Sequence, residues 1–195
     1  MRALVIYCHP VEGSFCSAMR DAAVQGLRAG GHDVDIIDLA ADQFNPVINE
    51  TEWDSYMKGT AYIAPELARY VQLVQQAELM VFVYPTWWSS VPSQLKGWLE
   101  RVFIPTVAFT LNKRNKVRPA LDNLRRIVTV TTFGSPWMYV KAINDNGSRI
   151  LLRAIRLTSS RRPKTTRLAL YKMDTSTPET RSDFLQSIET KLAQL

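Results

Sequence analysis

The sequence is short of several features that mark whole classes of protein. It has two cysteines, Cys8 and Cys16, which provide neither a disulfide framework nor the ligand spacing of a zinc site. No apolar run reaches the roughly 18 residues that a membrane span needs. Residues 1–7 carry one charge and lead directly into a strand, unlike a signal peptide. We therefore expect a cytoplasmic protein with no metal and no membrane span.

Three motifs with known chemistry are also missing. The chain has no Gly-x-Ser-x-Gly elbow of a hydrolase, no glycine-rich dinucleotide fingerprint and no Walker A loop. It shows no internal repeat, no linker and no domain boundary. Its 195 residues suit one domain with a sizeable core, so we expect residues 1–195 to form a single domain.

Positive charge is concentrated late in the chain. The net charge is +6, and one segment holds seven basic residues and no acid. These are Arg149, Arg153, Arg156, Arg161, Arg162, Lys164 and Arg167. The segment fits a phosphate-bearing partner, which could be nucleic acid, a membrane surface or a dinucleotide, or else a solvated helix face with a basic loop. Because no nucleic-acid-binding motif accompanies it, we expect no nucleic-acid partner.

The chain is organised around one strand–loop–helix unit. Residues 79–84 form a continuous apolar run, which is typical of a strand buried on both faces. Pro85 ends the strand because proline has no N–H for the ladder, and Pro92 opens a helix with apolar residues at helical spacing. The loop between them carries Trp87 and Trp88. These two side chains favour a flat, π-rich ligand, or else they pack against the neighbouring helix.

Strands and helices alternate along the chain. The expected strands span 3–7, 33–39, 79–84, 126–132 and 168–173. The expected helices run from Ser14 to Gly30-Gly31, over 65–76, over 92–103, over about 148–156, and from Ser176 or Thr177 to the end. Residues 40–64 and 105–119 are expected to be long loops, and 133–139 a turn. The alternation predicts an α/β fold with a doubly wound parallel sheet and helices on both faces.

Three turns share one edge of this sheet if its strand order is 2-1-3-4-5. They span 9–14, 85–90 and 131–134 and follow the first, third and fourth strands. Ligands of such sheets bind at the carboxyl ends of the strands, where the strand order reverses. In the first turn, Ser14 begins a helix whose unpaired N–H groups and dipole suit a phosphate. His9 donates to a phosphate or a ring, or it simply holds a loop carbonyl.

These stretches together resemble the flavodoxin-like NAD(P)H:quinone oxidoreductases, over at least residues 1–139. The residues that carry the resemblance are His9, Ser14-Phe15, Phe44-Asn45-Pro46, Pro85-Thr86-Trp87-Trp88-Ser89-Ser90-Val91-Pro92, Leu95-Lys96-Gly97-Trp98, Arg101-Val102-Phe103, Ala108-Phe109, Thr131-Thr132-Phe133-Gly134 and Met138-Tyr139. The resemblance implies a five-stranded flavodoxin-like fold with bound flavin, FAD or alternatively FMN. It implies an enzyme that passes two electrons, as hydride, from NADPH or NADH through the flavin to a quinone or a similar small acceptor.

The resemblance also implies the residues of the site. Those expected to bind the flavin are His9, Ser14, Phe15, Cys16, Pro85, Thr86, Trp87, Trp88, Ser89, Thr131, Thr132, Phe133, Gly134 and Tyr139. Val107, Ala108 and Phe109 are expected on the substrate side, contributed across a dimer interface. The backbone N–H groups of Phe133 and Gly134 and the hydroxyl of Tyr139 suit the negative charge that reduction leaves on the ring. Tyr139 is therefore the expected catalytic residue.

The sequence departs from this family in the turn after the fourth strand. Phe133 stands where the family has the first glycine of a Thr-Thr-Gly-Gly turn, and Pro136 stiffens the turn. Asn144 and Asp145 stand where the family has a histidine, so a proton relay from the tyrosine to that histidine cannot be assumed. We expect Phe133 and Trp137 to narrow the pocket.

Two other functions remain open at this point. One is a non-catalytic flavoprotein, an electron carrier or a redox-sensing partner of a membrane transporter, although carriers of that type tend to be acidic. The other is a flavin-free α/β binding module. Whichever holds, we expect a homodimer, because the aromatic Trp53–Tyr62 loop and Phe109 offer more aromatic surface than a monomer of this size exposes comfortably.

Overall fold

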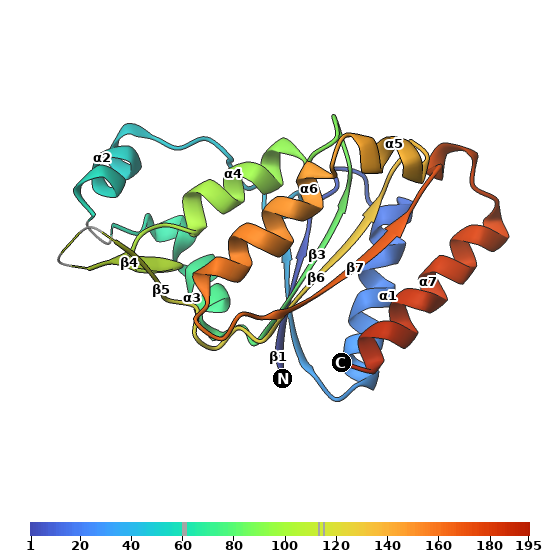
Figure 1. Cartoon of the computed structure of the whole chain (residues 1–195), viewed down its shortest axis with the longest axis horizontal. Helices are drawn as coiled ribbons and strands as arrows, with labels where there is room; N and C mark the ends of the chain where they lie inside the picture. Colours follow the sequence, from blue (N-terminus) through green and yellow to red (C-terminus); the bar gives the residue numbers. More distant parts are fainter. Residues whose placement is uncertain (60–61, 113, 115) are drawn as a thin grey trace.

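A computed structural model describes residues 1–59, 62–112, 114 and 116–195 (Figure 1). Five strands form one parallel sheet in the order β2-β1-β3-β6-β7. They are β1 (Arg2–Tyr7), β2 (Asp33–Asp38), β3 (Leu79–Pro85), β6 (Arg126–Thr132) and β7 (Lys164–Leu170). Because β6 and β7 are the fourth and fifth strands of this sheet, the predicted flavodoxin-like order 2-1-3-4-5 is confirmed.

Helices cover both faces of the sheet (Figure 1). One layer holds α1 (Phe15–Ala29) and α7 (Pro178–Ala193), and the other holds α3 (Ala68–Gln76), α4 (Ser93–Val102) and α6 (Asn146–Arg149). The central strand β3 is buried over its whole length. Its residues alternate between the layers, with Val81 packed in the α1 layer and Phe82 in the α4 layer. The continuous apolar run therefore marks a doubly covered strand, as predicted.

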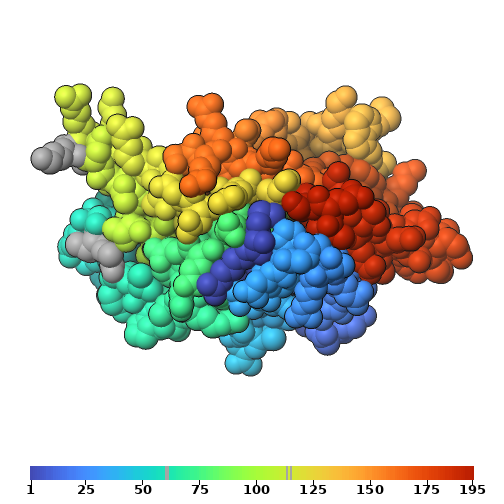
Figure 2. All heavy atoms as spheres, turned by 90° about the horizontal axis from the view of Figure 1, so that it is seen from below, coloured from blue at the N-terminus to red at the C-terminus, as the bar shows by residue number. Residues whose placement is uncertain are grey.

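The two helices of the first layer lie side by side, which Figure 2 shows as light blue against red. Their closest approach is at Gly26, where a Cβ atom would stand 2.5 Å from the carbonyl oxygen of Glu189. Both helices begin at the predicted caps. Ser14 Oγ accepts from the N–H of Ser17 at 3.2 Å, and Thr177 Oγ1 accepts from the N–H of Thr180 at 3.2 Å.

The prediction of an irregular loop over residues 40–64 is wrong, because α2 (Glu50–Lys58) lies within it. A capping box between Asn49 and Glu52 begins this helix, and Gly59 ends it with a φ of 63°. Within the helix only the side chain of Ser55 is buried, so the apolar periodicity that would reveal it is missing. The capping residues Asn49, Glu52 and Gly59 were the sequence signal from which this helix could have been predicted.

Three further boundaries differ from the predictions. The expected loop over 105–119 contains an antiparallel hairpin of β4 (Phe109–Leu111) and β5 (Val117–Pro119). The expected turn over 133–139 already contains the start of α5 (Trp137–Ala142). The last strand, β7, begins at Lys164 rather than Leu168, because an edge strand can carry polar residues that give no apolar run.

The predicted helix over 148–156 is broken into three types of turn. It comprises α6, a π turn over Ile150–Ala154 and a 3₁₀ turn over Ile155–Thr158. Two more 3₁₀ turns, Pro65–Leu67 and Met173–Thr175, complete the elements. Within the described ranges, none of the helices combines the length and the apolarity needed to cross a membrane.

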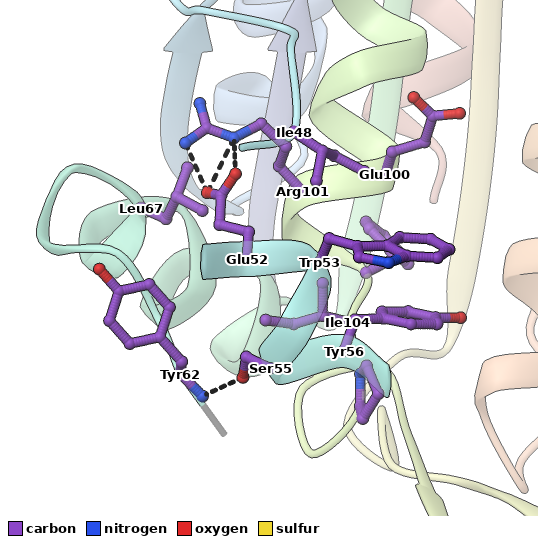
Figure 3. Close-up of a pocket in the computed structure, with 12 residues that line it drawn as sticks. Ile48, Glu52, Trp53, Ser55, Tyr56, Tyr62, Leu67, Glu100, Arg101 and Ile104 are labelled. Carbon is purple, nitrogen blue, oxygen red and sulfur yellow. Dashed lines mark hydrogen bonds and ion pairs between the residues drawn. The ribbon is translucent and has the colours of Figure 1, made fainter. Parts of the chain in front are cut away.

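A buried arginine joins α2 to α4 (Figure 3). The Arg101 side chain is 3% exposed and forms hydrogen-bonded ion pairs with Glu52, the shortest at 2.6 Å. It also reaches Glu66 at 2.9 Å and donates to the carbonyl of Asn45 at 2.7 Å. Burial opposes the charged form, but the hydrogen bonds to the two glutamates prevail and raise the pKa of Arg101. This cluster holds α2 against the body of the molecule.

Candidate active site

A cavity of about 440 Å³ opens at the carboxyl edge of the sheet, within the size range of small-molecule sites. Its walls come from the segments that follow β3, β6 and β7, and from α5. They are Pro85, Thr86, Trp87, Trp88, Ser89, Thr132, Phe133, Gly134, Ser135, Tyr139, Val140, Ile143, Met173 and Asp174. Nine of these residues belong to the predicted site. We call this cavity the switch-point pocket.

The turn after β3 presents Trp88 to solvent. The N–H of Trp87 donates to the carbonyl of Ser90 at 3.1 Å, and the N–H of Ser90 donates back at 3.0 Å. The two central residues, Trp88 and Ser89, have φ values of 49° and 58°, as a tight hairpin turn with both φ angles positive requires. Such φ values strain residues other than glycine by roughly 1–3 kcal/mol.

The exposure of the two tryptophans distinguishes between the two interpretations given above, contact with a flat ligand and packing against the neighbouring helix. Trp88 is fully exposed, at 101%, so the interpretation that it packs against the neighbouring helix is wrong. Trp87 is partly exposed and its ring lies 5.9 Å from that of His9. A strained turn that holds a bare indole beside a cavity is typical of a ligand-binding feature.

Two threonines anchor this turn to the neighbouring strand β6. The N–H of Thr86 donates to the carbonyl of Thr132 at 3.0 Å, and the hydroxyls of Thr86 and Thr131 lie 3.0 Å apart. Thr131 is buried and does not line the switch-point pocket, so it supports the turn from behind.

The turn after β6 offers fewer donors than predicted. The N–H of Phe133 donates to the carbonyl of Leu170 at 2.8 Å, because pairing with β7 continues past the strand end. The predicted role of this N–H in holding negative charge is therefore wrong. In the described part of the chain, the N–H groups of Gly134 and Ser135 have no acceptor. Gly134 faces a carboxylate, since a Cβ atom there would stand 2.5 Å from Asp174 Oδ2.

Of the two residues expected to narrow the pocket, Phe133 lines it and Trp137 does not. The ring of Phe133 is buried and stacks on Tyr171, with centroids 5.3 Å apart. The Arg167 guanidinium lies 5.4 Å from the Phe133 ring centroid. Trp137 lines a different cavity, where Lys141 Nζ lies 4.9 Å from its ring centroid.

Tyr139 is half-exposed and lines the switch-point pocket from α5. Asp145, one of the residues at the position of the family's histidine, is engaged elsewhere. Its Oδ2 pairs with Arg167 at 2.6 Å, and its Oδ1 accepts from the N–H of Ser148 at 3.2 Å. Asn144 and Asp145 line the other cavity rather than the switch-point pocket. Asn144 and Asp145 therefore do not form a proton relay with Tyr139.

The turn after β1 prepares backbone donors at the start of α1. Ser14 accepts from Ser17 and Ala18, which leaves the N–H groups of Phe15 and Cys16 as the orphan donors of the first turn. The Cys16 thiol itself is buried, and burial raises its pKa, so only its backbone can meet a ligand. His9 Nδ1 lies 3.1 Å from the backbone nitrogen of Val11 and 3.2 Å from its carbonyl oxygen, so the loop holds the ring through this nitrogen.

The predicted substrate residues lie away from this pocket within one chain. They follow the far end of α4, and the side chains of Val107 and Ala108 are buried in the core at 1% and 0% exposure. Phe109 is partly buried at the start of β4. None of the three lines the switch-point pocket. A contribution across an interface remains a prediction.

Sequence reasoning missed the contribution of the segment after β7. Met173 and Asp174 line the pocket, and so does Ser135. The signal was available, because Asp174 directly follows the predicted last strand, at the same carboxyl edge as the other turns.

Comparisons with known proteins agree with this arrangement. A family described by its flavodoxin-like fold matches residues 1–187. NAD(P)H dehydrogenase (quinone) 1 of Cavia porcellus is 33% identical over 166 residues, which cover 77% of this chain and 60% of that protein. The chain thus spans less than two thirds of the length of that relative.

Two solved structures show the same fold. The NAD(P)H:quinone oxidoreductase from Methanothermobacter marburgensis superposes with a TM-score of 0.84 at 19% identity, covering 100% of this chain and 96% of the other. An FMN-dependent NADH-azoreductase from Bacillus anthracis, solved in complex with FMN, gives a TM-score of 0.78 at 15% identity, covering 99% and 98%.

Proposed function

This chain belongs to the family with the flavodoxin-like fold, and we propose that it is a flavin-dependent oxidoreductase that passes hydride from NADPH or NADH to quinones. The observation that carries the proposal is the switch-point pocket. Its lining includes the strained tryptophan turn, Tyr139, and Gly134 and Ser135 with their unpaired backbone N–H groups. The similarity to NAD(P)H dehydrogenase (quinone) 1 of Cavia porcellus supports the choice of a quinone as acceptor.

The residues present suit a flavin. The orphan N–H groups of Phe15 and Cys16, with the dipole of the 15-residue helix α1, suit its phosphate. Trp88 offers an apolar surface to a flat ring, and the turn at Gly134 offers hydrogen-bond donors to its polar edge. We propose FAD as the flavin, with FMN as the alternative, since both share the ring and the first phosphate.

The bound flavin supplies the hydride chemistry, taking two electrons from the nicotinamide and giving them to the acceptor. The role of the protein is to bind the flavin and to orient it. The Thr86–Thr131 contact fixes the tryptophan turn against β6. Tyr139 and the N–H of Gly134, which line the pocket, would donate hydrogen bonds to the edge of the ring where negative charge develops and would thereby lower the barrier. Oxidation of NAD(P)H that depends on added quinone tests this activity and separates an enzyme from an electron carrier.

The position of Trp88 leads to a binding prediction. We expect Trp88→Ala to lower the flavin content of the purified protein or its turnover, because the indole is the exposed apolar surface of the pocket wall. The measurement is the ratio of flavin absorbance to protein absorbance, together with steady-state kinetics. Trp137→Ala, which removes an indole from the other cavity, is the control for flavin content alone and should leave that content unchanged. Unchanged flavin content and kinetics in Trp88→Ala would assign the indole no role in binding.

We also propose a cytoplasmic homodimer in which Phe109, the partly exposed member of the three predicted substrate residues, serves the site of the partner. Trp53 and Tyr56 support it, because their rings stack 6.5 Å apart on α2 and remain about half-exposed. They border a cavity of about 290 Å³ between α2 and α4 (Figure 3).

Such exposed aromatic surface is unusual for a monomer. Light scattering at micromolar concentration should therefore give the mass of two chains. The mass of one chain would contradict the dimer.

A further inference from the structure

A second cavity, of about 300 Å³, lies between α5, α6 and β7. Four cationic side chains line it, Lys141, Arg149, Arg153 and Arg167, with Asp145 as the one acid among its lining residues. Asp145 is already paired with Arg167 at 2.6 Å. Lys141, Arg149 and Arg153 form no ion pair within the described ranges of the chain. We call this cavity the basic pocket.

Hydrogen bonds of Arg167 hold the floor of the basic pocket. Arg167 donates to the hydroxyl of Tyr171 at 2.7 Å and to Ser148 Oγ at 3.3 Å. The π turn that follows α6 spans Ile150–Ala154 and carries Arg153. Such turns are rare and occur often at functional sites. Arg149, the last residue of α6, and Arg153 in this turn line the same cavity.

The shape and chemistry of the basic pocket favour a small phosphate ester over a polymer or a membrane. A concave pocket that joins arginines to an indole suits a phosphorylated nucleoside, because guanidinium forks bind phosphate oxygens and the aromatic ring takes the base. The basic segment found in the sequence does not form one flat face, since Arg167 turns inward to Asp145 and its own aromatic neighbours.

The basic pocket adjoins the switch-point pocket. Val140 on α5 lines both cavities. Trp137 and Lys141 of the same helix line the basic pocket, whereas Tyr139 and Ile143 line the switch-point pocket. A dinucleotide that places its nicotinamide in the switch-point pocket can therefore extend across α5 into the basic pocket.

We propose that the basic pocket binds a phosphate group of the adenosine half of the nicotinamide cosubstrate, with Arg149 and Arg153 as its ligands, and that this group is the 2′-phosphate of NADPH. This inference rests on the proposed function and adds cosubstrate preference to it. Hydrogen bonds to charged groups of this kind correspond to roughly ten- to a hundredfold in affinity.

Isothermal titration of the flavin-loaded protein with NADP⁺ and NAD⁺ tests the proposal. The wild-type protein should bind NADP⁺ at least roughly tenfold more tightly than NAD⁺, and Arg149→Gln/Arg153→Gln should abolish that difference. The control is Lys116→Gln/Arg118→Gln, which removes the same charge from exposed positions around β5 and should leave the difference intact.

The outcomes separate the possible occupants. Equal weakening of NADP⁺ and NAD⁺ by the arginine variant would assign the basic pocket to the diphosphate instead of the 2′-phosphate. No weakening of either, or the same weakening in the control, would overturn the proposal. Loss of duplex DNA or anionic-vesicle binding in the arginine variant, with nucleotide binding unchanged, would overturn it too.

The flavin content and quinone-dependent turnover of the wild-type protein report on the proposed function separately. A flavin-loaded, active protein without NADP⁺ preference contradicts only the basic pocket. A flavin-free protein that still binds NADP⁺ through Arg149 and Arg153 contradicts only the proposed function.

Discussion

Arg101→Met is expected to lower the free energy of unfolding by about 3–5 kcal/mol. The guanidinium is 3% exposed, and its main partner, Glu52, is 10% exposed. Removing the arginine leaves a nearly buried carboxylate without its counter-charge and the carbonyl of Asn45 without its donor. Urea unfolding at a fixed protein concentration measures the change.

Two comparisons isolate the cause of that loss. Arg125→Met removes the exposed pair with Glu78, whose side chains are 56% and 30% exposed, and should cost at most about 1 kcal/mol. Adding Glu52→Gln to Arg101→Met removes the stranded charge and should restore part of the stability. If the double variant is no more stable than Arg101→Met, lost packing rather than an unpaired charge explains the effect.

Tyr139→Phe is expected to slow the reduction of bound flavin by NADPH or NADH roughly ten- to a hundredfold, which corresponds to about 1.4–3 kcal/mol. In the proposed site, the hydroxyl would donate to an edge of the flavin ring that becomes negative only as hydride arrives. A contact that strengthens in the transition state affects rate more than affinity, so the flavin content should change little. Stopped-flow absorbance measures the rate.

Asp145→Asn is the matched comparison for Tyr139→Phe. An asparagine can still accept from the N–H of Ser148 at the start of α6, and only the ion pair with Arg167 is lost. Because Asp145 lines the basic pocket and not the switch-point pocket, flavin reduction should slow far less than in Tyr139→Phe. Wild-type reduction rates in Tyr139→Phe would make Tyr139 part of the pocket wall and no more.

Periodic burial made most of the fold predictable. The run over 79–84 has no polar residue, which indicated a strand covered on both faces, and β3 is buried throughout. The caps Ser14 and Thr177 were legible because serine and threonine side chains satisfy first-turn N–H groups. By contrast, α2 and the first half of β7 have one face in water and left no apolar pattern.

The candidate site was predictable where residues follow a strand end. The turns after β3 and β6 meet at one cavity because parallel strands end at the same edge. Tertiary pairing decided what the sequence could not show. The N–H of Phe133 is taken by the carbonyl of Leu170 on β7, the edge strand next to β6. The aromatic ring that replaces glycine is stacked on Tyr171.

The central claim, that the switch-point pocket holds a flavin, is tested most directly by the mass of the small molecule released on heating the purified protein. We predict FAD, or alternatively FMN, in near-equimolar amount with the chain. A colourless protein that releases neither molecule, and that binds neither when FAD and FMN are added, would contradict the account.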